Sequence, residues 1–170
     1  MGIFRPKTGM GIVIRRAKES DANGMYKLIK ELAEYENAPN EVKITPEQLK
    51  KDGFGENILF NAFVADYNGS VIGMALFYPR YSTWKGKTLH LEDLVVTSKF
   101  RKHGIGKALF ERVVLEAKKS NVQRMEWQVL DWNEPAIKFY KSVHSNFDNE
   151  WINCTFSVDQ LSSYNFKTIK

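Results

Sequence analysis

The sequence has little cysteine and no long hydrophobic run. Its longest apolar stretches are far shorter than the ~20 residues that a helix needs to cross a bilayer, so we expect no membrane span. The one cysteine, Cys154, cannot form a disulfide within the chain, which favours a reducing compartment and a cytoplasmic location. It lies between Trp151 and Val158, a segment that predicts strand, and there we expect a buried, unreactive thiol.

Metal-binding residues are also sparse. The three histidines, His90, His103 and His144, are spread along the chain and form no cluster with the cysteine. Protein metal sites need several histidine, cysteine or carboxylate ligands at short spacings. We therefore expect no metal site.

The sequence lacks any run of basic residues, although its net charge is positive. A formal charge of +5 and a pI near 9.2 indicate a polyanionic partner, either nucleic acid or a phosphate-rich cofactor. Lysines and arginines are dispersed along the chain. This dispersion favours the cofactor, and a basic nucleic-acid binder stays as an alternative.

The length and the apolar patterns predict one domain. A chain of 170 residues can bury one sizeable core and is short for two ordinary domains. Residues 1–11 show no periodicity and are expected to form a loose arm before a single domain over residues 12–170. Apolar patterns predict strands at 12–16, 62–65, 71–77, 88–96 and 124–129, and further strands in the tail near 151–158. They predict a first helix that follows Ser20 and Asp21 directly, has its apolar stripe from Met25 to Tyr35 and ends at Glu34 and Glu36. Further helices are predicted from Pro46 to Gly53, Gly104 to Lys119 and Glu134 to Lys141.

Short polar signals mark the starts of these elements. Asn68-Gly69 between two strands is a hairpin signal, because both residues tolerate a positive φ. Side-chain oxygens placed to cap a first helical turn come from Ser20 and Asp21, from Thr45 with Gln48 closing a capping box, and from Asn133.

Two adjacent acids interrupt the apolar strand at 88–96. Apolar residues occupy odd positions up to Leu91 and include even positions from Leu94, so the alternation slips at Glu92 and Asp93. Such a slip is what a β-bulge produces, and bulges often lie beside active sites. Two carboxylates in an apolar strand are costly to bury, so either they serve a function or they lie at a solvated strand edge.

The segment after this strand predicts a phosphate-binding turn. Residues Arg101 to Gly106 read R-K-H-G-I-G and lead into the helix that ends at Lys119. Glycines let a backbone approach an anion closely, and the amides and dipole at a helix start attract it. A G-x-G alone is more often a plain turn, but its place between a strand and a helix strengthens the prediction.

The motif R-x-x-G-x-G after such a strand resembles the cofactor signature of the GNAT acetyltransferase superfamily. Nearly the whole chain after the arm resembles the diamine acetyltransferase family of this superfamily. The segments that carry this resemblance are Asp52-Gly53-Phe54-Gly55-Glu56, Leu91-Glu92-Asp93, Trp132-Asn133-Glu134-Pro135 and Phe139-Tyr140-Lys141. The segments at 81–86 and 129–133 are most similar to the branch that acetylates the side-chain amine of thialysine. The resemblance implies an α/β (α+β) fold with a mixed, mostly antiparallel sheet of about six to seven strands and about four helices.

The resemblance also implies a role for each matching residue. Acetyl-CoA would be held by Leu94, Val95, Val96, Arg101, Lys102, His103, Gly104, Ile105, Gly106 and Lys107, and by Asn133, Glu134, Pro135 and Ala136. Glu92 would take a proton from the amine, and Tyr140 would give one to the departing thiolate. The amine site would be lined by Tyr35, Glu36, Trp84, Glu92, Asp93, Glu126, Trp127 and Gln128. The relatives are homodimers, so a symmetric dimer that shares the substrate cleft is implied.

General chemistry supports a base in such a site. An alkyl amine with a pKa near ~10 is mostly protonated at neutral pH and cannot react with a thioester until a base removes the proton. By the resemblance, the polyamine-specific branch has an acid where this chain has Ser82, which favours a thialysine-like amine, and an acidic contact near Glu150 is left open. The alternatives are a protein N-terminal or lysine acetyltransferase and a non-catalytic acyl-CoA sensor.

Overall fold

The computed structural model describes residues 11–166, so the predicted arm lies outside the described residues except for Gly11. The chain forms two compact units that divide between Gln128 and Val129. In the described part, no helix combines the length and apolar character that a membrane span requires.

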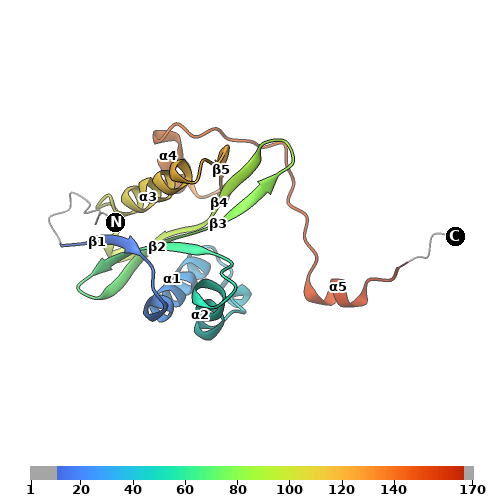
Figure 1. Cartoon of the computed structure of the whole chain (residues 1–170), viewed down its shortest axis with the longest axis horizontal. Helices are drawn as coiled ribbons and strands as arrows, with labels where there is room; N and C mark the ends of the chain where they lie inside the picture. The colour runs from blue at the N-terminus through green and yellow to red at the C-terminus, as the bar shows by residue number, and fades with distance from the viewer. Residues whose placement is uncertain (1–10, 167–170) are drawn as a thin grey trace. The chain divides into compact units, whose positions relative to one another are not determined.

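The first unit is built on one mixed sheet. Its strands are β1 (Val13–Arg16), β2 (Asn61–Tyr67), β3 (Ser70–Ser82), β4 (Gly86–Val96) and β5 (Arg124–Glu126). They lie in the order β1-β2-β3-β4-β5, with antiparallel pairing up to β4 and parallel pairing of β5 with β4 (Figure 1). The predicted mostly antiparallel sheet is confirmed, and Asn68 and Gly69 both have positive φ in the hairpin between β2 and β3.

The sheet has five described strands, so the prediction of six to seven was wrong. Residues 151–156 form no strand, and Trp151 and Ile152 are exposed, as is Cys154, whose burial we expected. A strand needs a neighbour for its backbone groups, and no described strand pairs with this segment. The strand predicted at 124–129 also ends early, at Glu126, and the next residue, Trp127, packs edge-on against Phe110.

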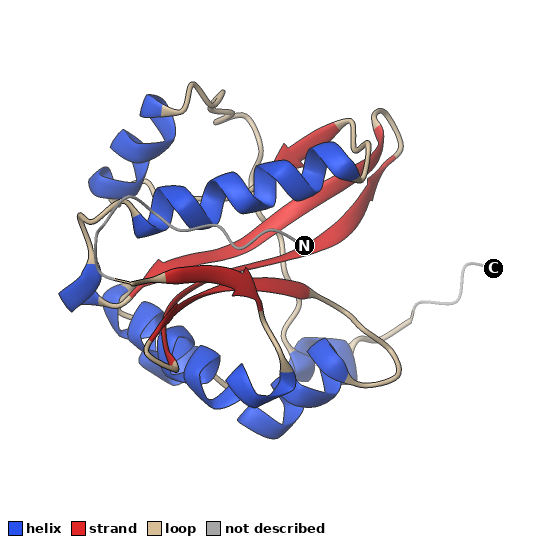
Figure 2. Ribbon diagram, turned by 60° about the vertical axis from the view of Figure 1, so that its left-hand side comes forward, coloured by secondary structure: helices blue, strands red, loops and turns tan. Residues whose placement is uncertain are grey.

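Helices cover both faces of this sheet (Figures 1 and 2). On one face lie α1 (Ala22–Tyr35) and α2 (Pro46–Phe54), and on the other lies α3 (Ile105–Lys119). Short 3₁₀ turns, η1 (Glu19–Asp21), η2 (Pro39–Glu41) and η3 (Ser98–Phe100), join these elements. The second unit contains α4 (Glu134–Ser142) and α5 (Val158–Ser163). The described helices therefore number five rather than about four, because α5, which begins where the predicted tail strands end, was not predicted.

Each face of the sheet buries its own apolar layer. The layer under α1 and α2 includes Met25, Leu28, Leu49, Met74 and Val95. On the opposite face α3 contacts β2, β3 and β4 and buries Ile105, Leu109 and Val113. Because β4 contributes to both layers, its position is fixed from two sides.

The capping predictions were partly right. Thr45 accepts a hydrogen bond from the Gln48 amide, as expected. The Gln48 side chain, however, donates to Asp52 at 2.7 Å, so the reciprocal half of the capping box does not form. The helix also continues one residue past Gly53.

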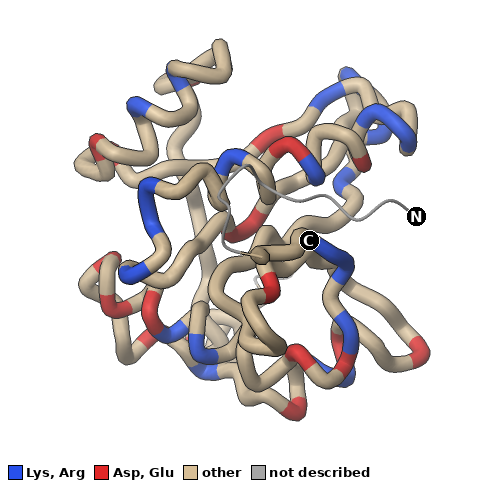
Figure 3. Tube along the Cα trace, turned by 90° about the vertical axis from the view of Figure 1, so that its left-hand side faces the viewer, with Lys and Arg blue, Asp and Glu red and all other residues tan. Residues whose placement is uncertain are grey.

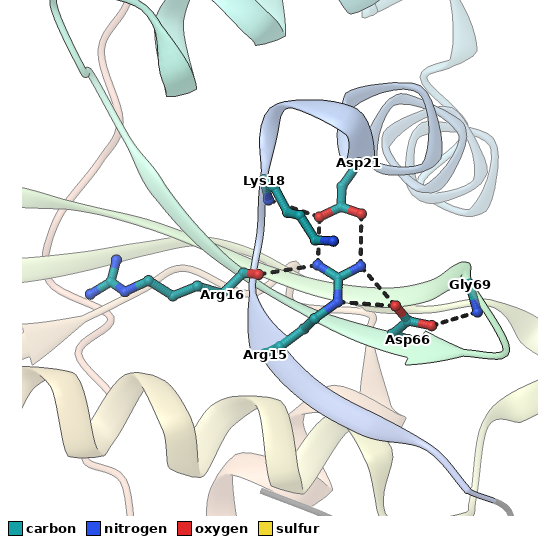
Figure 4. Close-up of polar contacts among 6 residues, drawn as sticks. All are labelled: Arg15, Arg16, Lys18, Asp21, Asp66 and Gly69. Atoms are coloured by element: carbon teal, nitrogen blue, oxygen red, sulfur yellow. Dashed lines mark hydrogen bonds and ion pairs between the residues drawn. The ribbon is translucent and has the colours of Figure 1, made fainter. Parts of the chain in front are cut away.

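Asp21 was expected to cap α1 but instead joins a cross-element ion-pair network (Figure 4). The Arg15 guanidinium donates to both carboxylate oxygens of Asp21, at 2.6 and 2.8 Å, and to Asp66 at 2.8 and 3.0 Å. Burial alone would raise the pKa of Asp21, but hydrogen bonds from Arg15 and from the Lys18 amide lower it below its ordinary value. The network fastens β1 to β2 and to the start of α1.

Arg15→Ala should therefore destabilise the fold strongly. It leaves Asp21, whose side chain is 7% exposed, beside Asp66 without the guanidinium. Loss of one partner from a buried pair costs on the order of 3 kcal/mol. The exposed pair of Lys138 and Glu134 provides the control, since Lys138→Ala should change the free energy of unfolding by less than about 1 kcal/mol.

The difference in free energy of unfolding between wild type and Arg15→Ala should decrease as pH falls. A carboxyl with a lowered folded pKa stabilises the fold above its unfolded pKa and loses that contribution as pH falls through the folded value. In urea titrations, the free energies of unfolding of wild type and Arg15→Ala should differ more at pH 7 than below pH ~4. A difference that stays constant over this range would contradict the role of Asp21.

Candidate active site

β4 contains the β-bulge that its sequence predicts. Asp93 lies opposite Leu76 on β3, whereas Leu91 lies opposite the next residue, Phe77. Glu92 is therefore the extra residue and has no partner of its own on β3. The slip in alternation identified the bulge correctly because one inserted residue exchanges the two faces of a strand.

The bulge turns both acids toward the face covered by α1 and α2. Before it, His90 lies opposite Tyr78, and after it Asp93 lies opposite Leu76. Both of these β3 residues pack in the layer under α1 and α2, and directly opposite residues in a sheet share a face. Glu92 follows His90 by two positions and lies on the same side, where it contacts Tyr78.

Glu92 is held through one oxygen. The Tyr78 hydroxyl donates to its Oε2 at 2.8 Å, and His90 Nε2 lies 3.5 Å from the same oxygen. The Glu92 side chain is 50% exposed, so solvent and small molecules can reach it. Burial and the neighbouring Glu92 carboxylate raise the pKa of Tyr78 to about 12, which keeps the phenol protonated and able to donate.

Asp93 and Glu36 complete a group of three carboxylates. Burial, followed by the charges of Glu92 and Glu36, raises the pKa of Asp93 to about 6. Glu36 follows the last residue of α1, and burial raises its pKa as well. Within residues 11–166 no lysine or arginine forms an ion pair with Glu36 or Asp93. An ammonium group placed here would relieve their mutual repulsion.

The second half of β4 has an open edge. Among the described strands, β5 pairs only with Thr88 to His90. The Thr97 amide donates to Ile72, so the alternation of an antiparallel ladder turns the backbone groups of Val96 and Leu94 away from β3. Val95, by contrast, places its side chain in the core. The edge at Leu94 and Val96 could bind an extended, amide-containing ligand as an added strand would.

The turn after β4 has the backbone conformation of an anion site. Lys102 and Gly104 both have positive φ, and α3 begins directly after them at Ile105. No side chain caps this helix, and nothing lies within 4 Å of where a Cβ on Gly104 would be. Left-handed residues before a helix start converge their amides into a concavity that suits a phosphate. Buried Ile105 anchors the turn, and Lys102, His103 and Lys107 are exposed.

Arg101 contacts the protein rather than extending from this turn. Its Nε donates to the Val96 carbonyl at 2.9 Å, and its guanidinium lies 5.1 Å above the Tyr35 ring and 3.8 Å from Glu31. Glu31 also accepts from the Ser98 amide at 2.7 Å. Arg101 and Glu31 thus tie the β4–α3 connection to α1. Lys102 and Lys107 are the exposed lysines of the predicted phosphate segment.

Other predicted amine-site residues have partners of their own, although Glu126 on β5 lies directly beside His90 of β4. Glu126 lies between Arg80 at 3.0 Å and Arg124 at 2.7 Å, so its charge is already balanced. Trp127 packs on Phe110, and Gln128 ends the first unit. Trp84 is 83% exposed in the turn of the β3–β4 hairpin, which projects from the rest of the sheet in Figure 1. Glu92 follows this hairpin's Gly86 by six positions along β4, a span of about 20 Å.

The predicted residues of the second unit occupy α4. Asn133 caps this helix by accepting from the Ala136 amide at 3.3 Å, as predicted, and Glu134 and Pro135 form its first turn. Tyr140 is buried, and burial raises its pKa to about 12. Its phenol is therefore protonated at neutral pH and can donate a hydrogen bond to a negatively charged atom.

Sequence reasoning missed two residues that hold the site together. Tyr78 and His90 were assigned no role, although both contact Glu92. The pairing of Tyr78 with His90 follows from the register of the β3–β4 hairpin, which could be counted back from its turn at Gly86. Among the described residues no three or more histidine, cysteine or carboxylate side chains, the three acids around Glu92 included, are arranged so that they could hold a metal ion. Figure 3 shows basic and acidic residues interspersed along the trace.

Comparison with known proteins finds acetyltransferases among the sequence relatives and among the similar structures. The profile of the acetyltransferase (GNAT) family matches residues 24–144. Thialysine N-epsilon-acetyltransferase of Mus musculus is 40% identical over 159 residues, covering 87% of this chain and 94% of that protein. An integron cassette protein of V. cholerae is similar in structure, with a TM-score of 0.74, 24% identity and coverage of 92% of this chain and 100% of that one. An aminoglycoside N-acetyltransferase in complex with CoA has a TM-score of 0.69 at 18% identity and covers 92% and 97% of the two chains.

Proposed function

Because this chain belongs to the acetyltransferase (GNAT) family, we propose that it transfers acetyl from acetyl-CoA to a primary amine of a small molecule, by direct reaction in a ternary complex. The observation that carries the proposal is the arrangement along β4. A half-exposed carboxylate at a bulge, an open strand edge and an anion-binding turn follow one another from Glu92 to Gly106.

The residues of β4 and the following turn fit acetyl-CoA. The open edge offers the backbone amides of Leu94 and Val96 and the Leu94 carbonyl to the amides of the pantetheine arm, while the Val96 carbonyl already accepts from Arg101. The amides from Lys102 to Lys107, with their two exposed lysines, suit the pyrophosphate. We assign contacts with the pantetheine also to Asn133, Glu134, Pro135 and Ala136. When bound, acetyl-CoA supplies an acyl group activated as a thioester.

The chain's own residues would manage the protons. Glu92 accepts a proton from the substrate ammonium, directly or through water, and releases the lone pair that forms the new bond. Backbone amides at the bulge are suited to stabilise negative charge on the acyl oxygen. Tyr140, which is protonated at neutral pH, donates to the departing thiolate. The one cysteine of the chain lies in the tail, which favours direct transfer over a covalent enzyme intermediate.

The amine substrate is proposed to be a thialysine-like amino acid or a diamine. Glu36, Glu92 and Asp93 attract a cation and have no lysine or arginine partner among the described residues. Glu126 is balanced by two arginines, so we assign the attraction to the other three acids. Ser82 Oγ accepts from the amides of Trp84 and Lys85, so this position shapes the hairpin turn and adds no charge for a second ammonium.

A thiol-release assay tests this proposal. Acetyl-CoA would be supplied with thialysine, lysine, putrescine, spermidine or a histone peptide under matched conditions. We expect thialysine to give the highest kcat/KM and the peptide the lowest. Preference for the peptide would favour a protein acetyltransferase, and absence of turnover with every amine, together with binding of CoA, would favour an acyl-CoA sensor.

The pH dependence of substrate binding should report Asp93. Its pKa of about 6 means that it is charged above this pH and becomes neutral below it. We therefore expect KM for the amine to rise as pH falls through about 6, while KM for acetyl-CoA changes little. Asp93→Asn should raise the amine KM at pH 7.5 and flatten its change near pH 6. The same inflection in Asp93→Asn would assign the titration to another group.

We further propose that the active unit is a homodimer in which Trp84 serves the partner's amine site. Within one chain Trp84 and Glu92 lie about 20 Å apart along the strand, too far for both side chains to contact one small amine. Trp84 is also among the most exposed aromatic residues described. A two-fold contact in which each hairpin reaches the other chain would bring a tryptophan to each acidic cluster.

Subunit mixing distinguishes the two arrangements. Glu92→Gln and Trp84→Ala chains would be denatured together, refolded and compared with each variant alone. If Trp84 acts across the dimer, the mixed dimer contains one intact site, and activity should rise above the mean of the two parents. No increase, or a monomer by light scattering, would contradict shared sites.

A further inference from the structure

Tyr78 and His90 both lie beside the same carboxylate oxygen of Glu92, Oε2. Tyr78 on β3 and His90 on β4 lie directly opposite each other, and their rings pack at 5.2 Å. The Tyr78 hydroxyl donates to Glu92 Oε2 at 2.8 Å, and His90 Nε2 lies 3.5 Å from Oε2. No described residue forms a hydrogen bond to Oε1. The two carboxylate oxygens are therefore not equivalent.

The surroundings of His90 favour one tautomer. The residue is 8% exposed, and its Nδ1 is buried with no hydrogen-bond partner among the described residues. A proton on Nε2 directs an N–H toward the carboxylate and leaves only a lone pair on Nδ1. The reverse tautomer would bury an unpaired N–H and set two lone-pair-bearing atoms against each other, which costs more.

We propose that Tyr78 and His90 are positioning residues that hold Oε2 of Glu92, so that Oε1 alone is presented to the substrate amine. The inference rests on the proposed function, because it takes Glu92 as the base. Neither residue belongs to the set that the sequence assigned to catalysis, cofactor binding or substrate binding. Both act through Glu92 and not on the amine.

Restraint of this side chain has a clear chemical value. A half-exposed glutamate has three rotatable bonds and would otherwise occupy several rotamers. Asp93, directly next to it, carries a like charge above pH about 6 and would push the carboxylate away from the amine site. The Tyr78 hydroxyl offsets this repulsion and remains protonated at every pH at which the fold is expected to work. Reacting groups misplaced by about 1 Å can lose roughly 10²-fold in rate.

Tyr78→Phe tests the proposal because it removes the hydroxyl and keeps the ring. We expect kcat to fall about tenfold, with KM for acetyl-CoA and the calorimetric affinity for CoA unchanged. Tyr67→Phe is the matched control, since it keeps the ring contact with Phe100 and lies on β2, a strand that contains no predicted site residue. His90→Leu should lower kcat in the same way, and His90→Gln, which restores an N–H donor, should recover part of the loss.

A double-mutant cycle separates positioning from a general structural effect. In a Glu92→Gln background, Tyr78→Phe should change kcat less than about twofold, because its target has already been altered. The melting temperatures of the same four proteins measure the contact without any substrate and should also be non-additive. Equal losses of kcat from Tyr78→Phe in both backgrounds, or an unchanged kcat despite coupled melting temperatures, would overturn the inference. A wild type that binds CoA but acetylates no amine would overturn the proposed function itself.

Discussion

Glu92→Gln is expected to lower kcat/KM for thialysine by about 10²–10⁴-fold, the usual contribution of a general base. Glutamine keeps the size of the side chain, and its amide oxygen can still accept from Tyr78, so the fold and the bulge should persist. What it loses is the ability to take a proton from an ammonium group. The loss should appear in the chemical step, and calorimetric binding of CoA should match wild type.

The same variant has a characteristic pH profile. An amine with a pKa of ~10 loses its own proton as pH rises. The ratio of wild-type kcat/KM to that of Glu92→Gln should therefore decrease between pH 7 and pH 9.5. Glu47→Gln, an exposed change on α2, is the control and should match wild type throughout. Turnover that is unchanged in Glu92→Gln would remove this residue from the mechanism.

Gly104→Ala is expected to weaken CoA binding at least tenfold. The φ of Gly104 is +75°, a conformation that costs an alanine about 1–2 kcal/mol. Its Cβ would also enter the space in front of the first amides of α3, where we place the pyrophosphate. The backbone must then either shift its amides or keep a methyl group in the way of the anion.

Gly69→Ala is a closely matched control for this change. Gly69 also has a positive φ, +83°, and open space around its Cβ position, but it lies in the hairpin between β2 and β3. Both variants should lose similar stability in thermal melts, and only Gly104→Ala should lose affinity in calorimetry with CoA. Equal CoA affinity in the two variants would show that the turn before α3 does not bind the cofactor.

Features that depend on neighbouring residues were predictable from the sequence. The bulge at Glu92 follows from a change of parity, the hairpin from Asn68-Gly69, and the cap of α4 from Asn133. Each depends on atoms within a few residues of one another. The cap predicted at Asp21 was wrong, because Arg15 on β1 binds that carboxylate in place of the first turn of α1. Arg15 is itself held by Asp66 on β2, which is distant in the sequence.

Features that depend on distant partners were not predictable in the same way. Of the residues that the sequence grouped with Glu92, Glu36 and Asp93 lie close enough for their charges to interact in the fold. The use of Arg101 to bind Val96 and of Arg80 to balance Glu126 required the positions of other elements. The tail at 151–156 has the composition of a strand, but strand formation requires a partner that no described strand provides.

The competing functions make different demands on these residues. A nucleic-acid binder needs a continuous basic surface, whereas lysines and arginines here alternate with acids along the trace (Figure 3). The DNA affinity of such a binder would fall steeply as the salt concentration rises. For this chain we expect a negligible slope in a salt titration of DNA binding. A sensor without activity has no need of a half-exposed carboxylate that two neighbours hold in place beside an open strand edge.

A crystal structure of the chain with CoA and thialysine would test the central claim most directly. The account predicts the pyrophosphate on the amides between Lys102 and Lys107, the pantetheine along β4 at Leu94 and Val96, and the side-chain amine within hydrogen-bonding reach of Glu92 Oε1, directly or through one water. CoA bound at another surface, or an amine held away from Glu92, would contradict it.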